Sequence, residues 1–301
     1  MHLYSRAVGL GSIKTRAAMD KLINLIVKQA ILDDDVIISE REQLGGGYYE
    51  AQIDKLMFDE KKVTAGLIIR GTYNPEKKKF KRLFYFPYLE SDLIHRCSEI
   101  NVGRLADKEA YMVHCTEAAR DILPIFFLNN IVDYLEEGTF FSADNREVLI
   151  SALSLEGKII LPVMKTESQL QEIKTVGRNR SQLIDRAMKG DKDAIDSLTI
   201  SDYDLITNVY RRTQKEDLFS IVDSSFVPSG MECDIYSVVG NIMAVDSEEN
   251  QITGEKVYFM LLECNETYFT LAINSADLVG MPFKGCRFVG RVWLQGNILP
   301  A

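Results

Sequence analysis

Segments in which apolar and polar residues alternate follow one another closely in the first third of the chain. Residues 49–54 alternate in this way, which turns one face of an extended segment inward and the other to water. Further strands are expected at residues 63–73 and 80–88, joined by a turn that Asn74-Pro75 initiates. Because parallel strands need long crossover connections, connections this short predict an antiparallel sheet.

Helical spacing appears at two places around these strands. Thr15 is suited to cap a first helix, in which apolar residues recur every three or four positions. A second helix is expected to begin at Thr116, and apolar residues cover most of its circumference. Pro124 predicts either a kink within this helix or a first turn that starts late. A helix of that kind is expected to be buried against the sheet.

The rest of the chain predicts a change of architecture. Residues 148–155 and 158–163 are expected to form a hairpin with Gly157 in its turn. The expected fold class is α+β, with an antiparallel sheet and packed helices, a helical connector, and a small C-terminal β barrel of OB-like or SH3-like type. The corresponding ranges are residues 1–165 for the α+β domain, 166–217 for the connector and 218–301 for the barrel.

Charge and cysteine content limit the classes of partner and the compartment. The chain has 301 residues and a formal net charge of −9, which disfavours general attraction to nucleic acid or to anionic membranes. The N-terminal residues lack the apolar core of a secretory signal, and no apolar run approaches the roughly 20 residues that span a bilayer. The number of cysteines, five, is odd and no pair has a framework spacing, so a cytoplasmic protein with reduced thiols is expected.

Several segments resemble an uncharacterised bacterial family of about this length, domain of unknown function 3881. They include Ser154-Leu155-Glu156-Gly157-Lys158, Glu232-Cys233-Asp234 and Trp293-Leu294-Gln295-Gly296. The resemblance extends over essentially the whole chain and implies a cytosolic bacterial protein. It implies no reaction, ligand or catalytic residue.

No catalytic residue or cofactor is expected from the motifs. Asp223, Glu232 and Asp234 are weak candidates for a hard-cation site of oxygen ligands, although alternating strands commonly carry such acids on a solvated face. The neighbours His114 and Cys115 would point to opposite faces of a strand, which argues against zinc. An enzyme is therefore not favoured, and a metal-dependent enzyme using Glu232 and Asp234 is kept as the alternative.

The closing strand contains the most distinctive surface. Alternation places Arg287, Arg291, Trp293 and Gln295 on one face, a composition typical of protein contact sites and also of platforms that stack single-stranded nucleic acid. The competing interpretation is that Trp293 packs under the helical connector while the arginines pair with local acids. Residues 218–301 contain ten acidic and four basic side chains, so a protein partner is preferred to nucleic acid. The leading hypothesis is a non-enzymatic interaction or regulatory protein that binds a protein partner through its C-terminal part.

Overall fold

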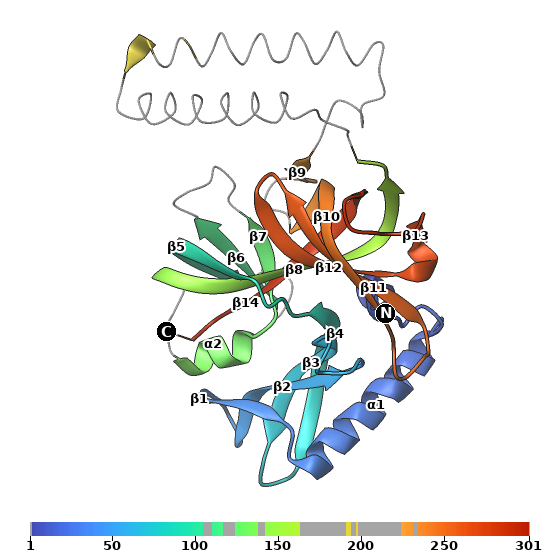
Figure 1. The fold of residues 1–301 in the computed structure, drawn as a ribbon. Helices are drawn as coiled ribbons and strands as arrows, with labels where there is room; N and C mark the ends of the chain where they lie inside the picture. The colour runs from blue at the N-terminus through green and yellow to red at the C-terminus, as the bar shows by residue number, and fades with distance from the viewer. Residues whose placement is uncertain are drawn as a thin grey trace. The chain divides into compact units, whose positions relative to one another are not determined.

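The computed structural model describes residues 2–104, 110–116, 124–137, 142–162, 191–193, 197, 224–230 and 234–300. These residues are mostly in β-strands (Figure 1). Residues 1–160 together with 224–301 form one compact unit, and residues 161–223 form another. The predicted helical connector, 166–217, lies almost wholly outside the described residues. The helices and strands named below all belong to the first unit.

The first sheet contains four strands and is antiparallel throughout, as the short connections predict. Its order is β1-β2-β3-β4, and its strands are β1 (Ile37–Leu44), β2 (Tyr48–Leu56), β3 (Ala65–Asn74) and β4 (Lys79–Leu89). The 3-10 helix η1 (Leu3–Val8) and helix α1 (Arg16–Asp33) precede it. The Thr15 hydroxyl accepts a hydrogen bond from the Ala18 N–H at 3.2 Å, which confirms the predicted cap. Met19, Ile23 and Ile26 of α1 are buried in one core with residues of this sheet.

The second sheet contains ten strands drawn from both halves of the chain. They are β5 (Ile94–Arg104), β6 (Tyr111–Thr116), β7 (Ile125–Leu128), β8 (Ser142–Ile160), β9 (Ser225–Pro228), β10 (Ile235–Glu249), β11 (Lys256–Cys264), β12 (Thr267–Asn274), β13 (Leu278–Val279) and β14 (Arg287–Ile298). Helix α2 (Ile131–Glu137) follows β7, and the 3-10 helix η2 (Ser275–Asp277) follows β12. Among the residues that the structure describes, none of the helices combines the length and the apolar character needed to cross a bilayer.

The pairing of β8 with β14 organises this sheet. The two strands run antiparallel from Ile160 opposite Arg287 to Val148 opposite Ile298. The pair belongs to one closed circuit of strands through β12, β11 and β10, and to a second through β5, β6 and β7. The C-terminal strands thus share a circuit with β8 (Figure 1), and a small barrel made from residues 218–301 alone is not confirmed.

Two local predictions are wrong, and both concern apolar segments. The helix expected to begin at Thr116 is not formed in the described residues, which contain β7 and then the short α2. The hairpin expected around Gly157 is one continuous strand, β8. A Cβ atom at Gly157 would lie 2.3 Å from Cε2 of Phe288, so this glycine makes room for an aromatic ring rather than for a turn.

The prediction of five reduced thiols is also wrong. Cys97 on β5 and Cys115 on β6 form a disulfide, with their Cα atoms 5.8 Å apart. Both are buried in the core that also contains Phe126 and Phe288. Cys264 and Cys286 are free and buried, and Cys233 lies outside the described residues.

Candidate functional site

Trp293, the centre of the predicted contact face, is buried in the structure. Its ring centroid lies 4.9 Å from that of His2, and 5.1 Å from those of both Tyr4 and Phe127. The side chain is 5% exposed, and its indole N–H donates to the Asp234 carboxylate at 2.6 Å. The tryptophan is therefore buried, as the competing interpretation expects, and its described ring neighbours are N-terminal residues and Phe127. Packing under the helical connector is untested, because residues 166–217 lie almost wholly outside the described residues.

The other three residues of the predicted face divide between interior and surface. The Gln295 amide donates to the Pro87 carbonyl at 2.8 Å and is fully buried, and Arg287 is also buried. Only Arg291 is exposed. The strand β14 contributes Phe288 to one core and Trp293 to the other, so neither of its faces is free along its length. Contact with a partner stays a prediction for this set, and only Arg291 is placed to make it.

The weak metal candidates do not assemble a site in the described residues. Asp223 and Glu232 lie outside them, and Asp234 accepts the indole hydrogen bond. Within the ranges that the structure describes, no group of three or more His, Cys, Asp or Glu side chains could hold a metal ion. His114 is exposed and Cys115 buried, which confirms that they occupy opposite faces of their strand.

Exposed apolar side chains gather at the C-terminal strands, between β13 and β14. Val279 is 65% exposed, Met281 73%, and Phe283 49%, and Met243 on β10 is 39% exposed. We refer to these four residues as the C-terminal patch. Neighbouring exposed apolar side chains, unlike isolated ones, are a feature of interaction sites.

Hydrogen bonds hold the segment that carries the patch. The Gly285 N–H donates to the Ile242 carbonyl and the Ile242 N–H donates to the Cys286 carbonyl, both at 2.8 Å, which fastens the segment beside Met243. The Cys286 N–H donates to the Phe283 carbonyl at 3.2 Å, and the Tyr258 hydroxyl donates to the Met281 sulfur at 3.7 Å. The exposed side chains are therefore presented by a fixed backbone.

Lysines surround the patch. Lys158 lies opposite Val279 across the β8–β13 pairing, and Lys284 follows Phe283 in sequence. The Lys256 ammonium lies 5.0 Å from the ring centroid of Tyr258, whose hydroxyl reaches Met281. None of these three exposed lysines makes an ion pair with a described residue. Their charge is available to a partner.

Arg291 belongs to the same outer surface. It lies opposite Glu156 across the β8–β14 pairing, and residues directly opposite share a face of a sheet. Glu156 and Lys158 are two residues apart on β8 and both are exposed, so Arg291, Lys158 and Val279 lie on one face. The one accessible residue of the predicted contact face thus adjoins the C-terminal patch.

The C-terminal patch was not predicted from the sequence, although the sequence contains a signal for it. Val279, Met281 and Phe283 are spaced two apart between two predicted elements, where such residues are expected to be polar. The lysine at Lys158 could not be assigned to the same surface, because that placement depends on the pairing of β8 with β13.

Comparison with known families identifies the chain. The family described as "Domain of unknown function, E. rectale Gene description (DUF3881)" matches residues 5–296. The chain belongs to this family. The match confirms the resemblance seen in the sequence, and the family description assigns no activity to DUF3881. Neither the curated proteins nor the solved structures contain a significant match to this DUF3881 chain.

Proposed function

We propose that this DUF3881 protein is a non-enzymatic interaction protein that binds an acidic, amphipathic segment of a protein partner through the C-terminal patch. The observation that carries the proposal is the exposure of Val279, Met281 and Phe283 on one hydrogen-bonded segment. Burial of such side chains supplies affinity in proportion to the apolar area removed from water.

The fixed backbone of the segment favours binding. Ordering a flexible loop on association costs free energy, roughly 0.5–1.5 kcal/mol for each immobilised side chain that is rich in rotamers. Because the hydrogen bonds to Ile242 already hold residues 285 and 286, a partner meets a surface that needs little further ordering. Phe283 and Met281 are the side chains expected to enter the partner, since aromatic residues and methionine are enriched at interface cores.

The charges around the patch favour an acidic partner. Lys158, Lys256 and Lys284 make no ion pair with a described residue, in a chain whose formal net charge is −9. Opposite charge across an interface accelerates association and excludes partners of like charge. An acidic segment is attracted locally to the lysines, whereas the rest of the protein repels it.

The small β barrel expected from the sequence is also part of the proposal. We propose that β8, β10, β11, β12 and β14 form a small β barrel, which is supported by their closed circuit of pairings. The patch then lies beside one end of the barrel, in agreement with a partner bound through the C-terminal part. A cytoplasmic location stays a prediction from the sequence.

Affinity capture tests the proposal. The bait is the full chain carrying Met281→Ser and Phe283→Ser, and it is compared with the unchanged chain. A matched control carries Leu25→Ser and Leu32→Ser, which replaces two leucines on α1 that are 58% and 69% exposed. The patch variant is expected to lose specific partners that both the unchanged chain and the control retain.

A photo-crosslinking residue at position 283 gives the second measurement. The captured protein is expected to crosslink there through a segment that is rich in Asp and Glu. If the patch variant remains folded and captures the same partners in the same amounts, the patch is not the binding surface.

A further inference from the structure

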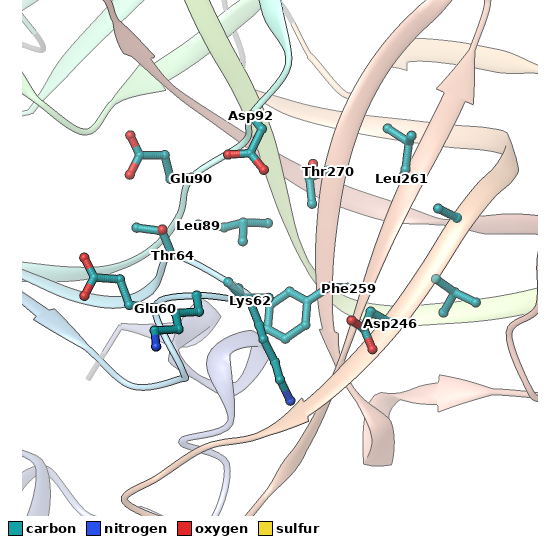
Figure 2. A pocket seen from close by; sticks show the side chains of 14 residues that line it. Glu60, Lys62, Thr64, Leu89, Glu90, Asp92, Asp246, Phe259, Leu261 and Thr270 are labelled. Carbon is teal, nitrogen blue, oxygen red and sulfur yellow. The ribbon is translucent and has the colours of Figure 1, made fainter.

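A cavity of about 500 Å³ lies at the opposite end of the four-stranded sheet from its β3–β4 turn (Figure 2). One wall comes from the β2–β3 connection and from the residues around the end of β4, and the other from β10, β11 and β12. In Figure 2, Glu60, Glu90 and Asp92 lie on one side, and Asp246, Leu261 and Thr270 lie on the strands opposite. The volume is within the range of small-molecule sites.

Backbone hydrogen bonds connect the elements that form the walls. The Glu90 N–H donates to the Thr64 carbonyl at 2.8 Å, which joins the end of β4 to the β2–β3 connection. The Gln251 N–H donates to the Met57 carbonyl at 2.9 Å, which joins that connection to the β10–β11 loop. The hydroxyls of Ser91 and Thr270 lie 3.2 Å apart. The cavity is therefore formed before any ligand arrives.

The cavity is acidic. Four carboxylates line it, those of Glu60, Glu90, Asp92 and Asp246, together with two lysines, Lys61 and Lys62. The Lys62 ammonium lies 2.5 Å from the carboxylate of Glu248, which is not among the lining residues. Because Lys62 is paired with Glu248, Lys61 is the lining lysine that opposes the four carboxylates. The negative charge of the lining therefore exceeds the positive charge, and the cavity attracts a cation.

The surroundings of Glu90 disfavour its ionised form. Burial raises the pKa of the Glu90 carboxyl above its usual value, and the negative charges of Asp92 and Asp133 raise it further. The side-chain amide of Asn297 donates to Glu90 at 3.0 Å and opposes the shift. A bound cation would favour the ionised carboxylate.

Apolar side chains complete the lining of the cavity. Val63, Leu89, Val245, Phe259 and Leu261 contribute apolar side chains among the acids. A bare metal ion gains nothing from such surfaces, whereas an alkyl chain that carries an ammonium or guanidinium group covers them while its head meets a carboxylate. The described residues also contain no cluster of three or more potential ligands that could hold a metal.

We propose that this cavity binds an organic cation, a primary amine or guanidine on a short alkyl chain, with Glu90 and Asp92 on one wall and Asp246 on the other receiving its charged groups. The site is separate from the C-terminal patch and does not depend on the proposed partner. Each carboxylate removed is expected to weaken binding roughly tenfold, since a hydrogen bond to a charged group contributes that much.

Calorimetric titration of the full chain with 1,5-diaminopentane tests this inference. n-Pentanol and glutarate, which are neutral and anionic compounds of the same chain length, are titrated in parallel, and magnesium chloride is added as a fourth arm. The diamine is expected to bind, and the other three are not. Diamine binding no tighter than that of pentanol, or binding of magnesium instead, would overturn the proposal.

Variants locate the site. Glu90→Gln with Asp92→Asn is expected to weaken diamine binding roughly 100-fold, and Gln at position 90 can still accept the Asn297 hydrogen bond. Asp246→Lys reverses the charge at an exposed position of the opposite wall and should abolish diamine binding. This variant tests the placement independently if the double variant does not fold. Glu76→Gln with Asp35→Asn removes the same charge at exposed positions outside the cavity lining and should bind as the unchanged chain does. Equal affinity in Asp246→Lys would refute the placement.

Discussion

The burial of Trp293 leads to a test that separates packing from partner contact. Trp293→Ala removes a side chain that is 5% exposed and that lies against the rings of His2, Tyr4 and Phe127. Replacing a buried aromatic residue by alanine costs about 3–5 kcal/mol of unfolding free energy. Trp293→Phe keeps a ring but loses the hydrogen bond to the Asp234 carboxylate, and it should cost at least about 1.5–3 kcal/mol.

The assay uses the fact that Trp293 is the single tryptophan of the chain. Its fluorescence is expected to be blue-shifted and shielded from acrylamide in the native protein, and to become quenchable in urea. Urea unfolding followed by circular dichroism then gives the unfolding free energy of both variants and of the unchanged chain. A quenching constant equal to that of free tryptophan, or a Trp293→Ala variant as stable as the unchanged protein, would refute the burial on which this reasoning depends.

Three further predictions concern single features of the structure. Gly157→Ala should destabilise the protein by about 1–3 kcal/mol in urea unfolding, because the new methyl group meets the Phe288 ring, and Phe288→Leu should relieve part of this loss. The pKa of Glu90 is higher in the folded than in the unfolded chain, so ionisation of Glu90 destabilises the folded state once the pH exceeds the unfolded-state pKa. Glu90→Gln should therefore raise the thermal midpoint at pH 7, and this gain should vanish below about pH 4, where Glu90 is protonated in both states. Reduction of the Cys97–Cys115 disulfide, which joins residues 18 apart, should lower stability by about 3 kcal/mol, and alkylation before reduction should leave both cysteines unmodified in a peptide map.

The elements that could be predicted from sequence are those that local patterns determine. The strand expected at residues 80–88 lies within β4, and the one expected at residues 63–73 covers most of β3. Strand-forming residues bounded by turn residues such as Asn74-Pro75 identify both segments, and that signal is a local property of the sequence. The Thr15 cap was likewise predictable, because the hydroxyl and the N–H that it accepts from are three residues apart.

The failures occur where distant residues decide the structure. An apolar run such as residues 125–128 suits a buried strand as well as a buried helix, and its pairing with β14 and β6 selects the strand. In the sequence Gly157 resembles a turn glycine. The close approach of the Phe288 ring, which explains the glycine, depends on the pairing of β8 with β14. Alternation predicts one inner and one outer face for β14, whereas Phe288 and Trp293 enter two different cores.

The candidate sites show the same division. The spacing of Val279, Met281 and Phe283 is visible in the sequence, so their part of the patch was predictable in principle. The cavity was not, since Glu90 and Asp246 come from distant segments that only the tertiary structure brings to one space. No local pattern encodes that proximity.

The shared strand β14 has a consequence for biosynthesis. It pairs with β7, β8 and β10, so both circuits of strands remain open until residues 287–298 have left the ribosome. Until then the nascent chain exposes unpaired edges of long strands, which are templates for aggregation. A stop codon at position 287, which removes β14 and the three residues after it, should therefore yield insoluble chains rather than a protein that lacks one strand, so the assembly of both circuits depends on completing translation.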